Sequence, residues 1–112
     1  MRRVLVVAIA VLGSAQLVSP VGAQEGAQGR ELAEKLCARC HAIGPRMTGR
    51  HPNAPSFQEI ARRYPVWNLQ EALAEGILVG HPDMPKFQLK PAQINALLTY
   101  MDTLGPKKEP VR

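Results

Sequence analysis

The sequence contains few aromatic residues and only two cysteines. Its 112 residues include one Trp, two Tyr and two Phe, and these are Phe57, Tyr64, Trp67, Phe87 and Tyr100. A small exported domain with so few large side chains usually needs several disulfides or a bound group to complete its core. Cys37 and Cys40 are three positions apart, so a bridge between them would close almost no loop and would stabilise little. Something other than side chains is therefore expected to fill the core.

The sequence also lacks an apolar run long enough to cross a membrane. The run at its start, Val4 to Leu12, has nine residues, against roughly 20 for a spanning helix. Basic residues precede this run, and a proline and small residues follow it, an order that is typical of a secretory signal peptide cleaved before Gln24. Residues 1–23 are therefore predicted to be a signal peptide, and residues 24–112 one domain with its core at about 29–104. An uncleaved anchor is the alternative.

The charge balance excludes little beyond nucleic acid. The formal net charge is +5, and loss of Arg2 and Arg3 with the signal peptide lowers it by two, to +3. No basic run is interleaved with aromatic residues, so we expect no nucleic-acid partner. A modest positive charge suits docking to an acidic partner, but it also serves solubility alone.

The spacing of apolar residues predicts helices and no strands. From Gly29 to Cys40 the apolar positions recur at intervals of three and four, as on one face of a helix. Residues 56–64 and 68–77 each open with a capping box and predict two shorter helices. A last helix is expected from Pro91, a favourable first position, to about Leu104. The fold class is therefore predicted to be all-α, with about four helices and long loops that wrap a ligand.

The segment Cys37-Ala38-Arg39-Cys40-His41 carries the clearest chemical signal. A Cys-x-x-Cys-His run is the attachment motif of c-type haem. Two cysteines three apart on a helix project from the same side, so each thiol can form a thioether with one haem vinyl group. His41 is then held against the iron, where imidazole is a good axial ligand. We therefore expect one covalent haem c with its iron.

Two other chemistries use cysteine pairs at this spacing. A thioredoxin-like redox pair requires strands in a βαβ pattern, and none is visible. Zinc requires two further ligands, which His51 and His81 could supply, but their spacing from Cys40 matches no familiar zinc module. Haem attachment is therefore favoured, with thiol exchange and zinc binding as the alternatives.

With this motif the chain resembles the class I c-type cytochromes, small monohaem proteins of the bacterial periplasm, from Gly29 to about Leu104. In this family a glycine eight residues before the first haem cysteine lets the first helix cross closely over the last, and Gly29 has that position. A close crossing needs small residues at the contact. The resemblance places Tyr100 at the crossing as the aromatic residue that packs there. Ala33 departs from the bulky residue that is frequent in the family, which could loosen the crossing.

Methionines are the first candidates for the second axial ligand. Met47 lies only six residues after His41 and is tethered near the wrong face of the haem. Met101 falls on the apolar face of the last helix, where a methionine usually belongs to the core. Met84 lies 43 residues beyond His41 on a separate loop and is the predicted ligand.

The loop of Met84 supports this choice. Pro82 and Pro85 flank it and reduce its freedom, which favours a fixed bond between iron and sulfur. The resemblance implies the same residue, because a methionine followed by proline in such a loop is the distal ligand of the family. His81 is the rival candidate, followed by His51. A thioether ligand favours ferrous iron and raises the reduction potential.

Weaker predictions concern the surroundings of the haem. The other ring nitrogen of His41 is expected to donate to a backbone carbonyl, and the resemblance assigns it to a proline, with Pro55 chosen over two earlier prolines of the loop. Tyr64 and Trp67 have polar tips that could reach haem propionates, with packing as the alternative role of each. Arg39, Arg46 and Lys86 could surround the exposed edge of the haem, or they could be ordinary solvated charges.

The predicted function is one-electron transfer in the periplasm, with His41 and Met84 on the haem iron. No substrate is turned over, so the protein is predicted not to be an enzyme. The expected partners are redox proteins, a donor and an acceptor, with no membrane span after signal cleavage. The protein would be a monomer or a subunit of a redox complex. The alternative functions are a haem-dependent enzyme or gas sensor with an open iron site, an electron-transfer subunit of a larger oxidoreductase, and a thiol–disulfide oxidoreductase.

Overall fold

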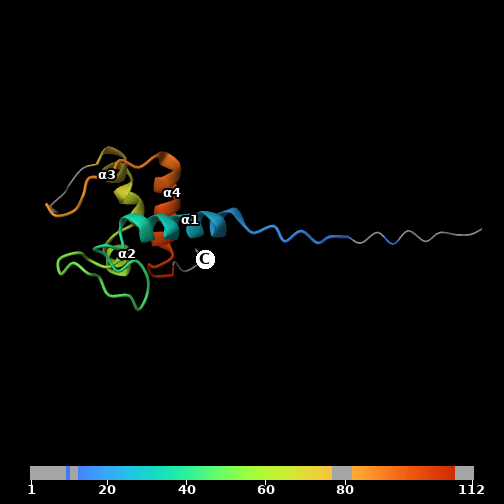
Figure 1. Cartoon of the computed structure of the whole chain (residues 1–112), viewed down its shortest axis with the longest axis horizontal. Helices are drawn as coiled ribbons and strands as arrows, with labels where there is room; N and C mark the ends of the chain where they lie inside the picture. The colour runs from blue at the N-terminus through green and yellow to red at the C-terminus, as the bar shows by residue number, and fades with distance from the viewer. Residues whose placement is uncertain (1–9, 11–12, 77–81, 108–112) are drawn as a thin grey trace, which may run out of the picture.

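The computed structural model describes residues 10, 13–76 and 82–107, and all regular secondary structure within these ranges is helical. This confirms the predicted all-α fold class. The elements are α1 at Val21–Leu36, α2 at Phe57–Arg63, the 3-10 helix η1 at Val66–Leu69, α3 at Gln70–Glu75 and α4 at Pro91–Asp102 (Figure 1). Within the described ranges no helix is both long enough and apolar enough to span a membrane.

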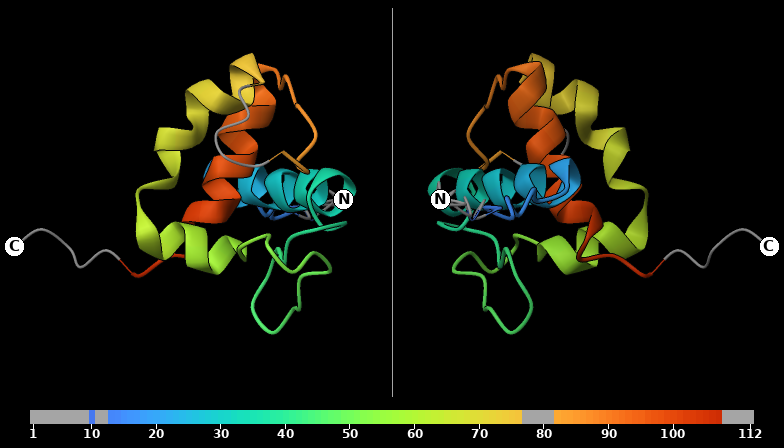
Figure 2. Two further views of the ribbon diagram at one scale, coloured as in Figure 1. Left: turned by 90° about the vertical axis from the view of Figure 1, so that its left-hand side faces the viewer. Right: turned by 90° about the vertical axis from the view of Figure 1, so that its right-hand side faces the viewer.

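Helix α4 is the central element of the domain. It lies between α1 on one side and the arc formed by α2, η1 and α3 on the other (Figure 2). The predicted apolar face of α4 is buried, including Ile94, Leu97, Leu98 and Met101. These side chains form one core with residues of the other elements, namely Ala33, Ile43, Phe57, Ile60 and Val66. Met101 is 3% exposed, as expected of a core methionine.

The crossing of α1 over α4 takes place at Gly29, as predicted. A Cβ atom on Gly29 would lie 1.8 Å from the carbonyl oxygen of Ala96 and 2.9 Å from Cβ of Tyr100. Only a residue without a side chain permits this approach, because the first distance is far inside van der Waals contact. Ala33, one turn further along α1, is completely buried in the core, so a small residue at this place fits the close crossing.

Two helix starts differ from the sequence-based prediction. Helix α1 begins at Val21, eight residues before Gly29, because its first turns are largely exposed and so carry no apolar pattern to reveal them. The capping box predicted at Asn68 is wrong: Asn68 lies inside η1, and α3 begins at Gln70 without a side-chain cap. The completely buried Val66 anchors this tighter turn directly after Pro65.

Helix α1 also ends earlier than predicted, at Leu36, so that Cys37 to Cys40 form a turn and not a last helical turn, whereas the remaining helix ends follow the prediction. The hydroxyl of Ser56 accepts a hydrogen bond of 3.1 Å from the backbone N–H of Glu59, which caps α2. Helix α4 starts at Pro91, where a proline loses no hydrogen bond. At the end of α3, Gly76 has a φ of +73°, the left-handed conformation that favours glycine. The predicted inward residue Ile77 lies outside the described residues.

Candidate functional site

The two cysteines and His41 lie on one compact turn at the end of α1. Cys37 directly follows the last residue of α1 and caps the helix, and its carbonyl accepts hydrogen bonds from the backbone N–H groups of Cys40 and His41, at 3.1 and 2.9 Å. Both thiols are free and partly buried. The structure thus brings together the three residues of the predicted attachment motif.

The environment of Cys37 does not favour thiol exchange. Burial raises the pKa of the Cys37 thiol to about 11. Thiol–disulfide exchange depends on a thiolate, which a thioredoxin-like site stabilises by lowering the pKa. A buried thiol with a raised pKa is therefore a poor redox nucleophile. The Cys37 sulfur would instead be joined to a haem vinyl group through a thioether.

The ring of His41 is oriented by two contacts. Its Nδ1 lies 2.7 Å from the carbonyl oxygen of Pro55, the proline chosen from the sequence. A carbonyl only accepts hydrogen bonds, so Nδ1 carries a proton, and in the neutral ring Nε2 keeps a free lone pair. The ring also contacts Phe57, at 5.8 Å between centroids and an interplanar angle of 48°. His41 can therefore offer Nε2 to a metal in a fixed direction.

The loop after His41 folds back onto the cysteine turn. A Cβ atom on Gly49 would lie 3.0 Å from the carbonyl oxygen of Cys40 and 3.2 Å from the backbone nitrogen of Ala42. The backbone N–H of His51 donates to the same Cys40 carbonyl at 3.2 Å. Residues 49–51 are thus packed directly against the attachment motif.

A second tie connects the same loop to α4. The hydroxyl of Tyr100 donates to the carbonyl of Ile43 at 2.7 Å, and Ile43 is 1% exposed. Tyr100 was predicted to lie at the helix crossing, but this hydrogen bond was not predicted from the sequence. A partly buried tyrosine usually finds a partner for its hydroxyl, which was the available signal.

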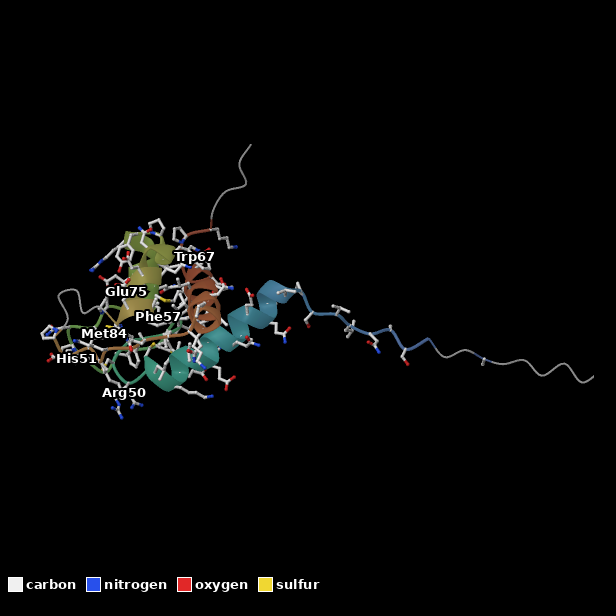
Figure 3. All side chains as sticks on the ribbon, turned by 90° about the horizontal axis from the view of Figure 1, so that it is seen from above. Arg50, His51, Phe57, Trp67, Glu75 and Met84 are labelled. Atoms are coloured by element: carbon white, nitrogen blue, oxygen red, sulfur yellow. The ribbon has the colours of Figure 1, made fainter. Side chains whose placement is uncertain are left out.

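Met84 lies on a loop that reaches the loop after His41. It is half-buried, and Figure 3 shows it on the same side of the domain as His51. The carboxylate of Asp83, its neighbour, is 3.4 Å from Nε2 of His51. Further along, the backbone N–H of Leu89 donates to the carbonyl of Leu73 in α3 at 2.9 Å. The loop of Met84 is therefore held against both the loop after His41 and α3.

The other candidates for the second axial ligand differ in burial and in their contacts. Met47 is 48% exposed, whereas Met101 is buried in the core. Both ring nitrogens of His51 face other groups, the N–H of Asn53 and the carboxylate of Asp83. His81 lies outside the described residues. Among the residues that the structure places, no group of three or more His, Cys, Asp or Glu side chains could hold a metal ion, so a zinc site has no support there.

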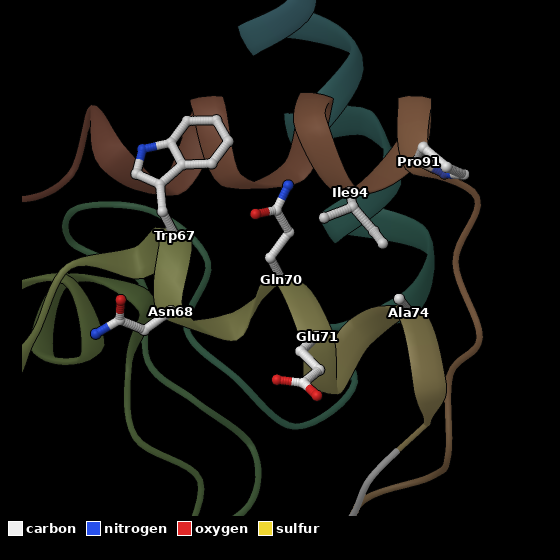
Figure 4. A pocket seen from close by; sticks show the side chains of 7 residues that line it. All are labelled: Trp67, Asn68, Gln70, Glu71, Ala74, Pro91 and Ile94. Atoms are coloured by element: carbon white, nitrogen blue, oxygen red, sulfur yellow. The ribbon is translucent and has the colours of Figure 1, made fainter.

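Tyr64 and Trp67, the two residues predicted to reach haem propionates, have different surroundings. Tyr64 is 39% exposed. Trp67 packs against the edge of the core and lies away from Met84 and His51 (Figure 3). It lines a separate open hollow of about 510 Å³ between η1, α3 and α4, shown in Figure 4. A role toward propionates remains a prediction for both, and packing is the role that the structure shows for Trp67.

Three basic residues that could surround a haem edge are exposed, as solvated charges would be. They are Arg39, Arg46 and Lys86. Arg46 has a φ of +65°, which places it at a tight turn of the loop after His41. Their role at a haem edge remains a prediction.

Comparisons with known proteins identify similar c-type cytochromes. The family described as "Cytochrome C oxidase, cbb3-type, subunit III" matches residues 24–101. Cytochrome c-552 of Bradyrhizobium diazoefficiens is 33% identical over 102 residues, which cover 91% of each of the two chains. No solved structure matches this chain.

Proposed function

This chain belongs to the class I c-type cytochromes, which are monohaem electron carriers, and on that premise we propose that His41 and Met84 are the axial ligands of its haem iron. The observation that carries the proposal is the orientation of His41. Its Nδ1 is engaged by the carbonyl of Pro55 at 2.7 Å, which leaves Nε2 available beside the two cysteines. This is the arrangement in which a histidine ligates a metal with a second hydrogen bond behind it.

The residues of the turn fit a covalent haem c. Cys37 and Cys40 are free thiols on one turn and would hold the group through two thioethers. The haem supplies an iron that accepts and releases one electron. The chain contributes the attachment, the orientation of the ligands and the apolar surroundings provided by Phe57 and the rest of the core.

Met84 is proposed as the sulfur ligand because its thioether is half-buried on a loop with little freedom. Pro82 and Pro85 restrict the backbone on both sides, and the loop is tied to α3 through Leu89. Met101 is a core residue, and Met47 is exposed on the proximal loop. Met84 is therefore the methionine that combines partial burial with a position on a separate loop.

The ligand assignment is tested on the ferric protein by its weak long-wavelength absorption band, which marks an iron–thioether bond. Met84→Ala should abolish the band and lower the reduction potential while the haem stays attached. Met47→Ala is the matched control, because it removes an exposed thioether and should leave the band intact. Loss of the band in Met47→Ala, or its persistence in Met84→Ala, would overturn the assignment.

Residues 1–23 are proposed to direct export to the periplasm and to be removed. The family match begins at residue 24, which supports this boundary. Cleavage there would remove only Val21 to Ala23 from α1, whose buried residues Gly29 and Ala33 lie further along. The mass of the exported protein should therefore correspond to a chain that starts at Gln24, within about two residues. An intact Met1 on haem-loaded protein would instead indicate an anchor.

A free carrier that turns over no substrate is the favoured role. A second role, subunit of a larger redox complex, has one observation behind it: the matching family is described as a subunit of a cytochrome oxidase. The similar cytochrome c-552 is covered over 91% of its length, which supports a small carrier with redox proteins as partners. Purification from the native membrane and soluble fractions separates the two roles, because a subunit would co-purify with its complex.

A further inference from the structure

His51 is fixed to the attachment motif through its backbone. Its N–H donates to the carbonyl of Cys40 at 3.2 Å, and Gly49 lies so close that a Cβ atom would be 3.0 Å from the same oxygen. The backbone of His51 therefore has a set position relative to the turn that carries the two cysteines and His41.

The side chain of His51 has a defined tautomer. Its Nδ1 accepts a hydrogen bond of 3.2 Å from the backbone N–H of Asn53, so Nδ1 carries no proton. In the neutral ring the proton is then on Nε2, which lies 3.4 Å from Oδ2 of Asp83. In the neutral ring the proton is thus on the nitrogen nearest the carboxylate, in a contact that is longer than a typical hydrogen bond.

Asp83 directly precedes Met84, so the contact between His51 and Asp83 restrains the loop that carries Met84. The far end of that loop is already tied to α3 by the hydrogen bond from Leu89 to Leu73, at 2.9 Å. The contact between Asp83 and His51 holds the other part of the Met84 loop against the loop after His41 (Figure 3). Met84 lies between the two ties.

We propose that His51 is a positioning residue that links the cysteine turn to the Met84 loop and keeps Met84 on the iron. The proposal rests on the ligation by Met84 proposed above. The carboxylate attracts the ring N–H, but the contact is long and Asp83 is 74% exposed, so its effect is modest. The contact lowers the population in which Met84 has left the iron, and that population controls access of other ligands.

The test measures binding of imidazole to the ferric, haem-loaded protein at about pH 8, where imidazole is mostly neutral and insensitive to a lost surface charge. Imidazole binds only when Met84 has left the iron. His51→Ala and Asp83→Ala should each raise the apparent imidazole affinity about two- to fivefold, the size expected when an exposed contact to a carboxylate is lost. The double variant should match the single ones, because both remove the same interaction.

Two further variants separate positioning from general stability. His51→Gln keeps an N–H donor for Asp83 and should restore most of the wild-type affinity. Glu31→Ala breaks the exposed Lys35–Glu31 pair on α1, far along the chain from the ligand loop, and should leave imidazole binding unchanged. If His51→Ala lowers the unfolding temperature but binds imidazole no better than Glu31→Ala, His51 is structural only and the proposal is overturned.

Failure of the ligand assignment gives a different result. A wild-type ferric protein without the thioether band would overturn ligation by Met84 itself. A wild-type band together with unchanged imidazole binding in all His51 and Asp83 variants would overturn the positioning role alone. If His51→Ala does not yield haem-loaded protein, Asp83→Asn provides the same comparison, because it removes the charge with little change of shape.

Discussion

Gly29 of α1 lies directly against the carbonyl of Ala96 in α4, so closely that a Cβ atom would be 1.8 Å from the oxygen. Neither group can yield easily, because the oxygen belongs to the backbone of a helix in the middle of the core. The position of the cysteine turn depends on this contact, since the turn is the continuation of α1.

Gly29→Ala should therefore destabilise the protein strongly. The added methyl group must push the two helices apart, and overpacking of this kind costs about 3 kcal/mol or more. Gly26→Ala is the matched control on the same helix, because a Cβ atom there meets nothing within 4 Å. It should be neutral or stabilise by up to about 1 kcal/mol, as alanine favours helix. Denaturant unfolding of the haem-loaded proteins measures both, and equal stability of the two variants would rule out a tight crossing.

The crossing was predicted through the resemblance to the class I c-type cytochromes, which places a glycine eight residues before the first haem cysteine at the contact of the first and last helices. Met101 was recognised as a core residue by its place on the apolar face of the last helix. The start of α1 was missed because its exposed turns have no apolar periodicity. The cap at Asn68 was wrong because burial of Val66 outweighs a local capping preference.

The candidate site also contains one part that could be predicted from the sequence and one part that could not. The cysteine turn and His41 are contiguous in the chain, so their spacing alone carries the chemistry. The contact between His51 and Asp83 joins two loops that are 32 positions apart in the chain, so it depends on the tertiary packing of the helices. No periodicity or motif signals such a contact, and it became visible only with the tertiary structure.

Tyr100→Phe should lower the stability by about 1–2 kcal/mol at neutral pH. It removes the hydrogen bond of 2.7 Å to the carbonyl of Ile43, and a buried carbonyl that loses its partner is costly. Tyr64→Phe is the matched control, since Tyr64 is 39% exposed. Chemical denaturation of the two variants should show the loss only in Tyr100→Phe.

The same hydrogen bond predicts a pH dependence. Burial raises the pKa of the Tyr100 hydroxyl, which Glu34 raises further and Arg30 lowers. The folded state therefore favours the protonated hydroxyl. Its contribution to stability is complete below the unfolded pKa of about 10 and is lost as the pH rises through the higher folded pKa. Between about pH 9 and pH 11 the wild type should lose more stability than Tyr100→Phe, and parallel losses would contradict this assignment.

The two cysteines should each carry one thioether. Wild-type protein should retain its haem through denaturing electrophoresis and gain the mass of one haem. Cys37→Ala or Cys40→Ala should weaken the attachment, and the double variant should lose all covalent haem, because no other thiol exists in the chain. Haem staining and mass spectrometry measure the outcome. A wild-type band without haem stain would refute covalent attachment.

Carbon monoxide separates a carrier from an enzyme or gas sensor, because it binds ferrous iron only at an open position. An electron carrier benefits from two fixed ligands, which keep the geometry similar in both oxidation states. Several features restrain Met84: the flanking Pro82 and Pro85, the hydrogen bond from Leu89 to Leu73, and the contact between Asp83 and His51. If Met84 occupies the iron about 99% of the time, the apparent affinity for carbon monoxide is about 100-fold below that of an open site.

The ferrous wild type at neutral pH should accordingly bind carbon monoxide poorly, and Met84→Ala should bind it about 100-fold more tightly. Met101→Leu is the matched control, because it replaces a core methionine with a side chain of similar volume and leaves the loop unchanged. Its affinity should stay at the wild-type value. Tight binding by the wild type would mean that one position on the iron is open in the native protein, and the enzyme or sensor role would then replace the carrier. An unchanged affinity in Met84→Ala would show that a different residue closes the iron.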